Sequence, residues 1–87
     1  MSKHEIASED KIAARVIETI AAQLELSRKE VQPEATFTED LKADSLAVME
    51  LLLALEDTFD VQASDEEIDQ MRTVQDAVQF VERQLAS

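Results

Sequence analysis

The chain has 87 residues, 45% of them apolar and 32% charged, which suits one small folded domain and is too short for two. Twenty acidic residues against eight basic ones give a formal charge of -12, which excludes nucleic acid and anionic membranes as natural partners because both repel an acidic surface. No cysteine is present, which excludes disulfides, thiolate metal ligands and a cysteine nucleophile. Any thiol chemistry must therefore be supplied by a group from outside the chain.

The fold class follows from what the sequence lacks. There is no glycine and there are only three aromatic residues, so hairpin turns and strands are short of the residues they prefer. We therefore expect an all-α fold, a small bundle with three main helices, a short third helix and a long first loop. The polar amino-terminal stretch and the absence of a long apolar run predict neither a signal peptide nor a membrane anchor, and hence a cytoplasmic location.

The first helix and the loop after it have different patterns. Residues 1–7 are expected to form a flexible tail, and Ser8 is a suitable N-cap for a helix that ends near Leu24 to Leu26. Residues 27–40 are irregular, with a capping-box pattern at Ser27 and Glu30 and a helix-breaking proline at position 33. Apolar residues recur every four positions along the helix, at Ile12, Val16, Ile20 and Leu24, with Ala13 and Ile17 beside them. Three apolar residues of the loop are expected to anchor it to the core: Val31, Phe37 and Leu41.

Three further helices follow the loop and complete a domain over residues 8–87. Asp44 is the expected N-cap of a second helix, SLAVMELLLALEDTF, which runs to about Asp60. A short third helix is predicted between Ser64 and Met71, and the pair Thr73 and Asp76 resembles a capping box that opens a fourth. The expected core face of the fourth helix consists of Val74, Ala77, Val78, Val81 and Leu85.

The second helix carries two apolar stripes. At about 100° per residue, one stripe is a conventional core face and consists of Val48, Leu51, Leu52, Leu55 and Phe59. The other stripe is Leu46, Met49 and Leu53, bordered by Glu50, Glu56 and Asp57. This second stripe is either covered by the fourth helix or the long loop, or it is a docking face with apolar anchors inside a charged rim.

The excess negative charge is concentrated around the same helix. Residues 34–69 contain twelve acids and one base, Lys42, while the rest of the chain contains eight acids and seven bases. By itself this charge indicates either a solubilising surface or a surface that selects partners rich in Lys and Arg.

Ser45 follows Asp44 at the start of the second helix and is expected to lie at the surface. A helix N-terminus has free backbone N–H groups and the positive end of the helix dipole, so a phosphoester on this serine would be favoured. Nucleophilic catalysis would need a base nearby, but the only histidine is His4 in the tail, and Lys42 is expected to be a solvated ammonium. A hydrolase is therefore rejected, whereas a purely capping role for Ser45 stays open.

These residues carry a resemblance to a known family. The run from Asp40 to Leu46 (DLKADSL), then Met49-Glu50-Leu51 and the run from Leu55 to Asp60 (LEDTFD), resembles the discrete acyl carrier proteins of fatty acid and polyketide synthases. The stretches DEE at 65–67 and TVQDAV at 73–78 are also similar to that family. The resemblance covers roughly residues 10–85.

The resemblance implies a function without catalysis. Ser45 would receive 4'-phosphopantetheine from coenzyme A through a separate phosphopantetheinyl transferase, and acyl groups would be carried on the terminal thiol as thioesters, shielded between the helices. No metal site or enzymatic activity is implied, and the protein is expected to act as a monomer. Contacts with the transferase and with acyl-processing enzymes that have basic docking faces are implied for Asp44, Leu46, Met49, Glu50, Leu53, Glu56 and Asp57.

The chain departs from the family pattern at several positions. Lys42 stands where the family commonly has Gly, so a different loop geometry is expected, and Ala47 stands where many fatty acid carriers have an acid. Ala63 and Ser64 replace a large aliphatic residue and Pro, which predicts either a reshaped acyl pocket or a looser core. A specialised carrier for a polyketide, aminoacyl or lipid-tailoring pathway therefore stays open beside a carrier of the fatty acid pathway. A less favoured alternative is an acidic module that binds a basic protein or calcium.

Overall fold

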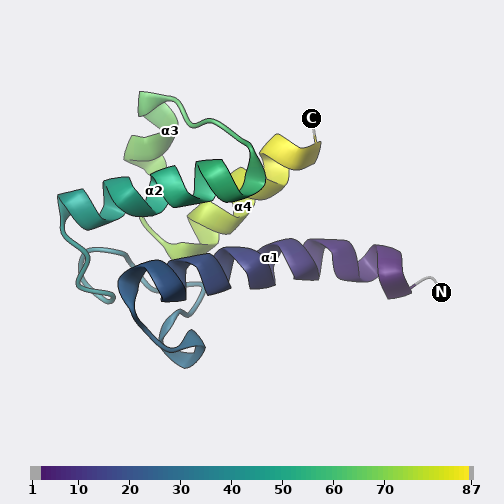
Figure 1. Ribbon diagram of the computed structural model, residues 1–87, viewed down its shortest axis with the longest axis horizontal. Helices are drawn as coiled ribbons and strands as arrows, with labels where there is room; N and C mark the ends of the chain where they lie inside the picture. Colours follow the sequence, from purple (N-terminus) through teal and green to yellow (C-terminus); the bar gives the residue numbers. More distant parts are fainter. Residues whose placement is uncertain (1–2, 87) are drawn as a thin grey trace.

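The computed structural model describes the backbone of residues 3–86 and the side chains of residues 11–86. Its helices are α1 (Lys3–Leu24), a 3-10 turn η1 (Arg28–Glu30), α2 (Ser45–Phe59), α3 (Asp65–Gln70) and α4 (Val74–Ala86), and no strand occurs within residues 3–86. The long helix α1 packs against both α2 and α4, while α3 is a short helix at the far side of α2 (Figure 1). The prediction of an all-α bundle with a short third helix and a long first loop is confirmed.

The first helix begins earlier than predicted. It starts at Lys3, so Ser8 lies inside the helix and the expected N-cap at Ser8 is wrong. No glycine or proline interrupts residues 3–7, so nothing in that stretch stops helix propagation toward the amino terminus. The division of the chain at residue 8 stays a prediction; Met1 and Ser2, and the side chain of His4, lie outside what the structure describes.

The core is one apolar cluster between α1, α2, α4 and the long loop. The predicted loop anchors Val31, Phe37 and Leu41 are all buried. The predicted core face of α4 is confirmed except at Leu85, which is 46% exposed, while Phe80 is buried instead. Leu85 belongs to the last turn of α4, which lies past the end of α2 in Figure 1 and so has less of the bundle to pack against.

The long loop is attached to the start of α4 by backbone hydrogen bonds. Thr36 and Thr73 form an isolated antiparallel β-bridge, the Phe37 N–H donates to the Arg72 carbonyl (3.0 Å), and the Val74 N–H donates to the Ala35 carbonyl (3.0 Å). This pairing joins segments more than thirty residues apart, and local sequence patterns do not reveal it. It fixes the chain just upstream of α2.

An aspartate secures each partner of the bridge. The Asp40 carboxylate accepts from the backbone N–H and the hydroxyl of Thr36 (2.8 and 3.1 Å), and these bonds, with Lys42 nearby, hold the pKa of Asp40 below its ordinary value. The Asp76 carboxylate accepts from the backbone N–H groups of Arg72 and Thr73 (3.0 and 3.1 Å). Burial raises the pKa of Asp76, but these bonds, the Thr73 hydroxyl and the Arg72 charge outweigh it, so its pKa is also lowered.

Of the two predicted capping boxes, the one at Thr73 is present, and the structure adds one at Ser64 that was not predicted. Ser64 and Glu67 exchange hydrogen bonds at the start of α3, and the Asp76 N–H donates to the Thr73 hydroxyl at the start of α4. The box predicted at Ser27 is wrong, because its side chain makes no capping hydrogen bond. The segment there is a single 3-10 turn, which is too short to need the reciprocal cap of an α-helix.

Candidate functional site

Ser45 is the first residue of α2, and its side chain is exposed, as predicted. Asp44 before it has extended backbone angles and caps the helix, with its Oδ1 accepting from the Ala47 N–H at 2.8 Å. The serine hydroxyl therefore stands at the positive end of a 15-residue helix, where backbone N–H groups face outward. Such a position suits a covalently bound phosphate group.

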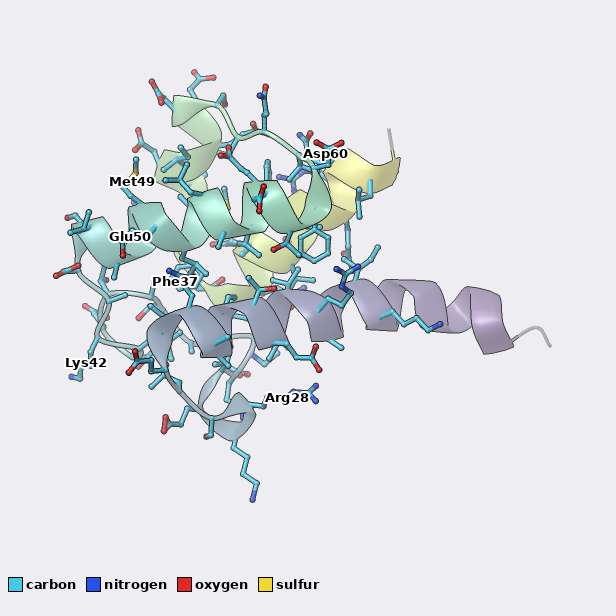
Figure 2. All side chains as sticks on the ribbon, in the orientation of Figure 1. Arg28, Phe37, Lys42, Met49, Glu50 and Asp60 are labelled. Carbon is cyan, nitrogen blue, oxygen red and sulfur yellow. The ribbon has the colours of Figure 1, made fainter. Side chains whose placement is uncertain are left out.

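The loop before Ser45 contains a left-handed turn without glycine. Lys42 has a φ of 60°, in the region that glycine adopts most readily, so the expected change of loop geometry is wrong at this residue. Its neighbours Leu41 and Ala43 are buried, and the Ala43 N–H donates to the Phe37 carbonyl at 2.8 Å. These contacts hold Lys42 in the turn, and Figure 2 shows its side chain pointing away from the bundle.

The second apolar stripe of α2 is exposed. Leu46, Met49 and Leu53 are 67%, 48% and 60% exposed, so the alternative in which α4 or the long loop covers them is wrong. The core stripe is buried at Leu51, Leu52, Leu55 and Phe59 and half-buried at Val48. Met49 and the exposed Glu50 can be followed on α2 in Figure 2.

The three acids beside this stripe do not have the same environment. Glu50 and Asp57 are exposed, but Glu56 is half-buried, and its Oε2 accepts from the Ala63 N–H at 2.8 Å. The Glu56 carbonyl also accepts from the N–H groups of Asp60 and Val61. Glu56 therefore holds the turn between α2 and α3, a role that the sequence analysis missed because it placed this residue only on the rim of the stripe.

A pocket of about 400 Å³ lies next to the start of α2. Its apolar wall includes Val48, which is one turn after Ser45, and its polar lining includes Thr38 and Arg72. Ala63 does not line this pocket; it is half-buried against the core. The full lining is Thr36, Phe37, Thr38, Glu39, Val48, Met71 and Arg72.

Other kinds of site are not assembled by the described residues. No group of three or more His, Asp or Glu side chains gathers in a way that could hold a metal ion within the part of the chain whose side chains are described. None of the described helices is both long enough and apolar enough to cross a membrane. Ser45 and its surroundings are therefore the feature of this structure with the clearest chemical role.

Comparison with known proteins identifies the family of the chain. The family model described as "Phosphopantetheine attachment site" matches residues 14–81. The chain is 46% identical over 72 residues to an acyl carrier protein of Solidesulfovibrio magneticus, covering 83% of this chain and 92% of that protein. It is 41% identical over 80 residues to one of Thermosynechococcus vestitus, covering 92% and 99%.

A solved structure supports the same relationship. An acyl carrier protein from Enterococcus faecalis, described for its high thermal stability, aligns with a TM-score of 0.73 at 30% identity, over 87% of this chain and 96% of that one. The resemblance inferred from the sequence is thus confirmed, and with it the expectation of a carrier rather than an enzyme. The chain belongs to the phosphopantetheine attachment family, as a non-catalytic acyl carrier of fatty acid synthesis or a related acyl pathway that bears covalent 4'-phosphopantetheine and interacts with acyl-processing enzymes.

Proposed function

We propose that Ser45 is the residue to which 4'-phosphopantetheine is attached. The observation that carries this proposal is the exposed Ser45 hydroxyl at the capped N-terminus of α2, beside a pocket. Asp44 supports the site by holding the first turn of the helix in place through its bond to Ala47. The helix dipole and the free N–H groups of that turn then favour the negative charge of a phosphodiester on Ser45.

The residues around Ser45 fit the attached group. When bound, the group supplies the thiol that this cysteine-free chain lacks, so that acyl cargo is held as a thioester. The buried side chains of Phe37 and Met71 give the adjacent pocket an apolar wall, against which methylene groups of the cargo lose contact with water. The polypeptide itself thus positions and shelters the cargo.

The docking surface of this proposal is the exposed face of α2. Leu46, Met49 and Leu53 provide apolar contacts, and Glu50 and Asp57 attract Lys and Arg of a phosphopantetheinyl transferase and of acyl-processing enzymes. Exposed ion pairs contribute only about 0.2 to 1 kcal/mol each, so docking is weak and fast, as a shuttle requires. Glu56 contributes less than its neighbours, since one of its carboxylate oxygens is already bonded to Ala63.

The assembly and location complete the proposal. The apolar cluster joins α1, α2, α4 and the long loop within one chain, with Ile68 of α3 packed against it, which supports a monomer. We place this carrier in the cytoplasm, where it would meet coenzyme A and its partner enzymes. The proposed cargo is a fatty acid intermediate, and the alternative cargo is an intermediate of a specialised acyl pathway.

The carrier role is tested by loading the chain with an acyl group and then cleaving the thioester. The purified chain is incubated with a long-chain acyl-coenzyme A and a promiscuous transferase, and the product is treated with hydroxylamine, which cleaves thioesters. We expect a mass gain of one acyl-phosphopantetheine, and hydroxylamine should remove the acyl part alone. A chain that gains no mass, or an acyl group that resists hydroxylamine, contradicts the carrier role.

The docking surface is tested by charge reversal. Asp57→Lys should slow loading by the transferase several-fold and weaken the dependence of the loading rate on salt, because it removes an attractive charge from the rim. Glu30→Lys is the matched control, since Glu30 is an exposed acid on η1 and away from α2. Equal rates for the two variants would remove Asp57 from the docking surface.

A further inference from the structure

Arg72 brings a fixed positive charge to the pocket beside Ser45. Its backbone is held on both sides, because its N–H donates to the Asp76 carboxylate (3.0 Å) and its carbonyl accepts from the Phe37 N–H (3.0 Å). Arg72 is one of the residues that line the pocket. A guanidinium group stays charged at every physiological pH, so the pocket always has this cation.

The charge of the Arg72 guanidinium group acts on the nearby Asp76 carboxylate, but without a direct ion pair. Among the side chains of residues 11–86 the guanidinium group forms no ion pair and no hydrogen bond, although residues 34–69 contain twelve acids. The Oδ2 atom of Asp76 already accepts hydrogen bonds from the backbone N–H groups of Arg72 and Thr73. Glu39 also lines the pocket, but it does not pair with Arg72.

The pocket combines this cation with apolar surface close to Ser45. Phe37, Val48 and Met71 give it apolar walls, and Thr38 adds a hydroxyl-bearing side chain. Val48 lies three residues after Ser45, which is about 4.5 Å along the helix axis. A purely alkyl chain filling the pocket would cover polar groups without replacing their hydrogen bonds to water, and that carries a free-energy cost.

We propose that Arg72 is an anion-binding residue for the group carried on Ser45, pairing with anionic oxygens that belong either to a carboxylate on the acyl cargo or to the phosphodiester of the arm. A guanidinium group binds both in the same two-pronged geometry. The carboxylate source would make half-thioesters of dicarboxylic acids the preferred cargo, with their methylene groups on the apolar walls. This inference rests on the proposed attachment at Ser45.

The test compares loaded forms of the same chain. Wild type and Arg72→Gln are each prepared without the arm, with unacylated phosphopantetheine, with a glutaryl group and with a hexanoyl group, which is similar in length to glutaryl but uncharged. Melting temperatures of all forms are measured, and the Arg72 side-chain Nε–Hε signal is followed by NMR. Arg28→Gln is the matched control, because Arg28 is an exposed arginine on η1.

Each source of the anion gives a distinct result. If the phosphodiester is the partner, adding the unacylated arm raises the melting temperature of wild type by about 3 °C more than that of Arg72→Gln. If the carboxylate is the partner, that excess appears only with glutaryl, and it grows in Glu39→Gln, where the competing negative charge is gone. In either case the Arg72 signal shifts on the same step, and Arg28→Gln behaves like wild type.

The proposal is overturned if the melting temperatures of wild type and Arg72→Gln differ by the same amount in every form, loaded or not, and the Arg72 Nε–Hε signal does not shift. This outcome is separate from failure of the proposed function, which would show earlier as a chain that cannot be loaded at Ser45. An Arg72→Lys variant distinguishes charge from geometry: it should keep part of the excess, because it retains the charge and loses the paired hydrogen bonds.

Discussion

The two turns that flank α2 both contain a left-handed residue other than glycine, and they are held in different ways. Before α2, Lys42 has a φ of 60° and the turn is fixed by contacts from distant parts of the chain, through Phe37 to Arg72. After α2, Asp60 has a φ of 56°, and the turn depends on bonds to the single residue Glu56. The end that presents Ser45 is thus built from long-range contacts, whereas the opposite end is fastened locally.

This difference predicts that the two ends differ in stiffness. Both turns have a buried apolar side chain, but the first also has hydrogen bonds to a distant segment and so opens only when much of the fold opens, while the second, bonded to the nearby Glu56, opens more locally. The proposed attachment site therefore stands on the more rigid end of α2. The following variants break or sharpen this comparison.

The largest effect is expected from removing the aromatic anchor of the first turn. Phe37→Ala should lower the free energy of unfolding by about 3 to 5 kcal/mol, because Phe37 is only 2% exposed and its loss leaves a cavity. Val61→Ala, at the second turn, removes less volume and should cost about 1.6 kcal/mol. Urea unfolding measures both values, and equal losses would contradict the unequal anchoring of the two turns.

A smaller effect is expected at the cap that secures the loop to α4. Asp76→Ala should cost about 1 to 2 kcal/mol at neutral pH, because it deletes the carboxylate that accepts from two backbone N–H groups. The pKa of Asp76 is lowered in the folded state, so its contribution is present above the ordinary value of 3.8 and is lost as the pH falls through the lowered value. The difference between wild type and variant should therefore shrink below about pH 4. A difference that stays constant down to pH 2 would refute this role.

Removing the local fastening of the second turn should have a milder and more confined effect. Glu56→Ala should lower the free energy of unfolding by about 1 kcal/mol, because it deletes the bond to the Ala63 N–H. Amide hydrogen exchange should speed up at residues 60–63 but not at residues 36–43. Asp57→Ala, next to it and exposed, should be close to neutral, and a similar loss in both variants would show that Glu56 holds no turn.

The smallest effect has the opposite sign. Lys42→Gly should raise the free energy of unfolding by about 0.5 kcal/mol, because relief of the left-handed strain slightly outweighs the added freedom of the unfolded chain. Asp60→Gly should raise the free energy of unfolding by less, since aspartate tolerates the left-handed conformation better than lysine does. A clear loss of stability in Lys42→Gly would show that the lysine side chain itself stabilises the turn.

Local patterns predicted the helices and most of the core well. The predicted capping residues Asp44 and Thr73 and the stripes of α2 act within a few residues, so the sequence contains the whole of their signals. Long-range features were not predicted: the Thr36–Thr73 bridge joins segments that have no shared local pattern. The inward bond of Glu56 was missed for the same reason, since its partner lies seven residues away in a loop.

The candidate site was predicted only in part. The position and exposure of Ser45 followed from its place after an N-cap, and the exposed stripe followed from helical periodicity. The pocket and its Arg72 were not predicted, because they form only when residues 36–39, α2 and the segment before α4 come together. At Lys42 the sequence suggested a changed loop, whereas the surrounding contacts impose the left-handed turn on a lysine.

The attachment residue is the central claim, and intact-protein mass spectrometry tests it most directly. Wild type, Ser45→Ala and Ser64→Ala are incubated with coenzyme A and a promiscuous phosphopantetheinyl transferase, with circular dichroism to show that all three are folded. We predict that wild type and Ser64→Ala each gain the mass of one phosphopantetheine and that Ser45→Ala gains none. A mass gain that persists in folded Ser45→Ala would place the arm on another residue and contradict the account.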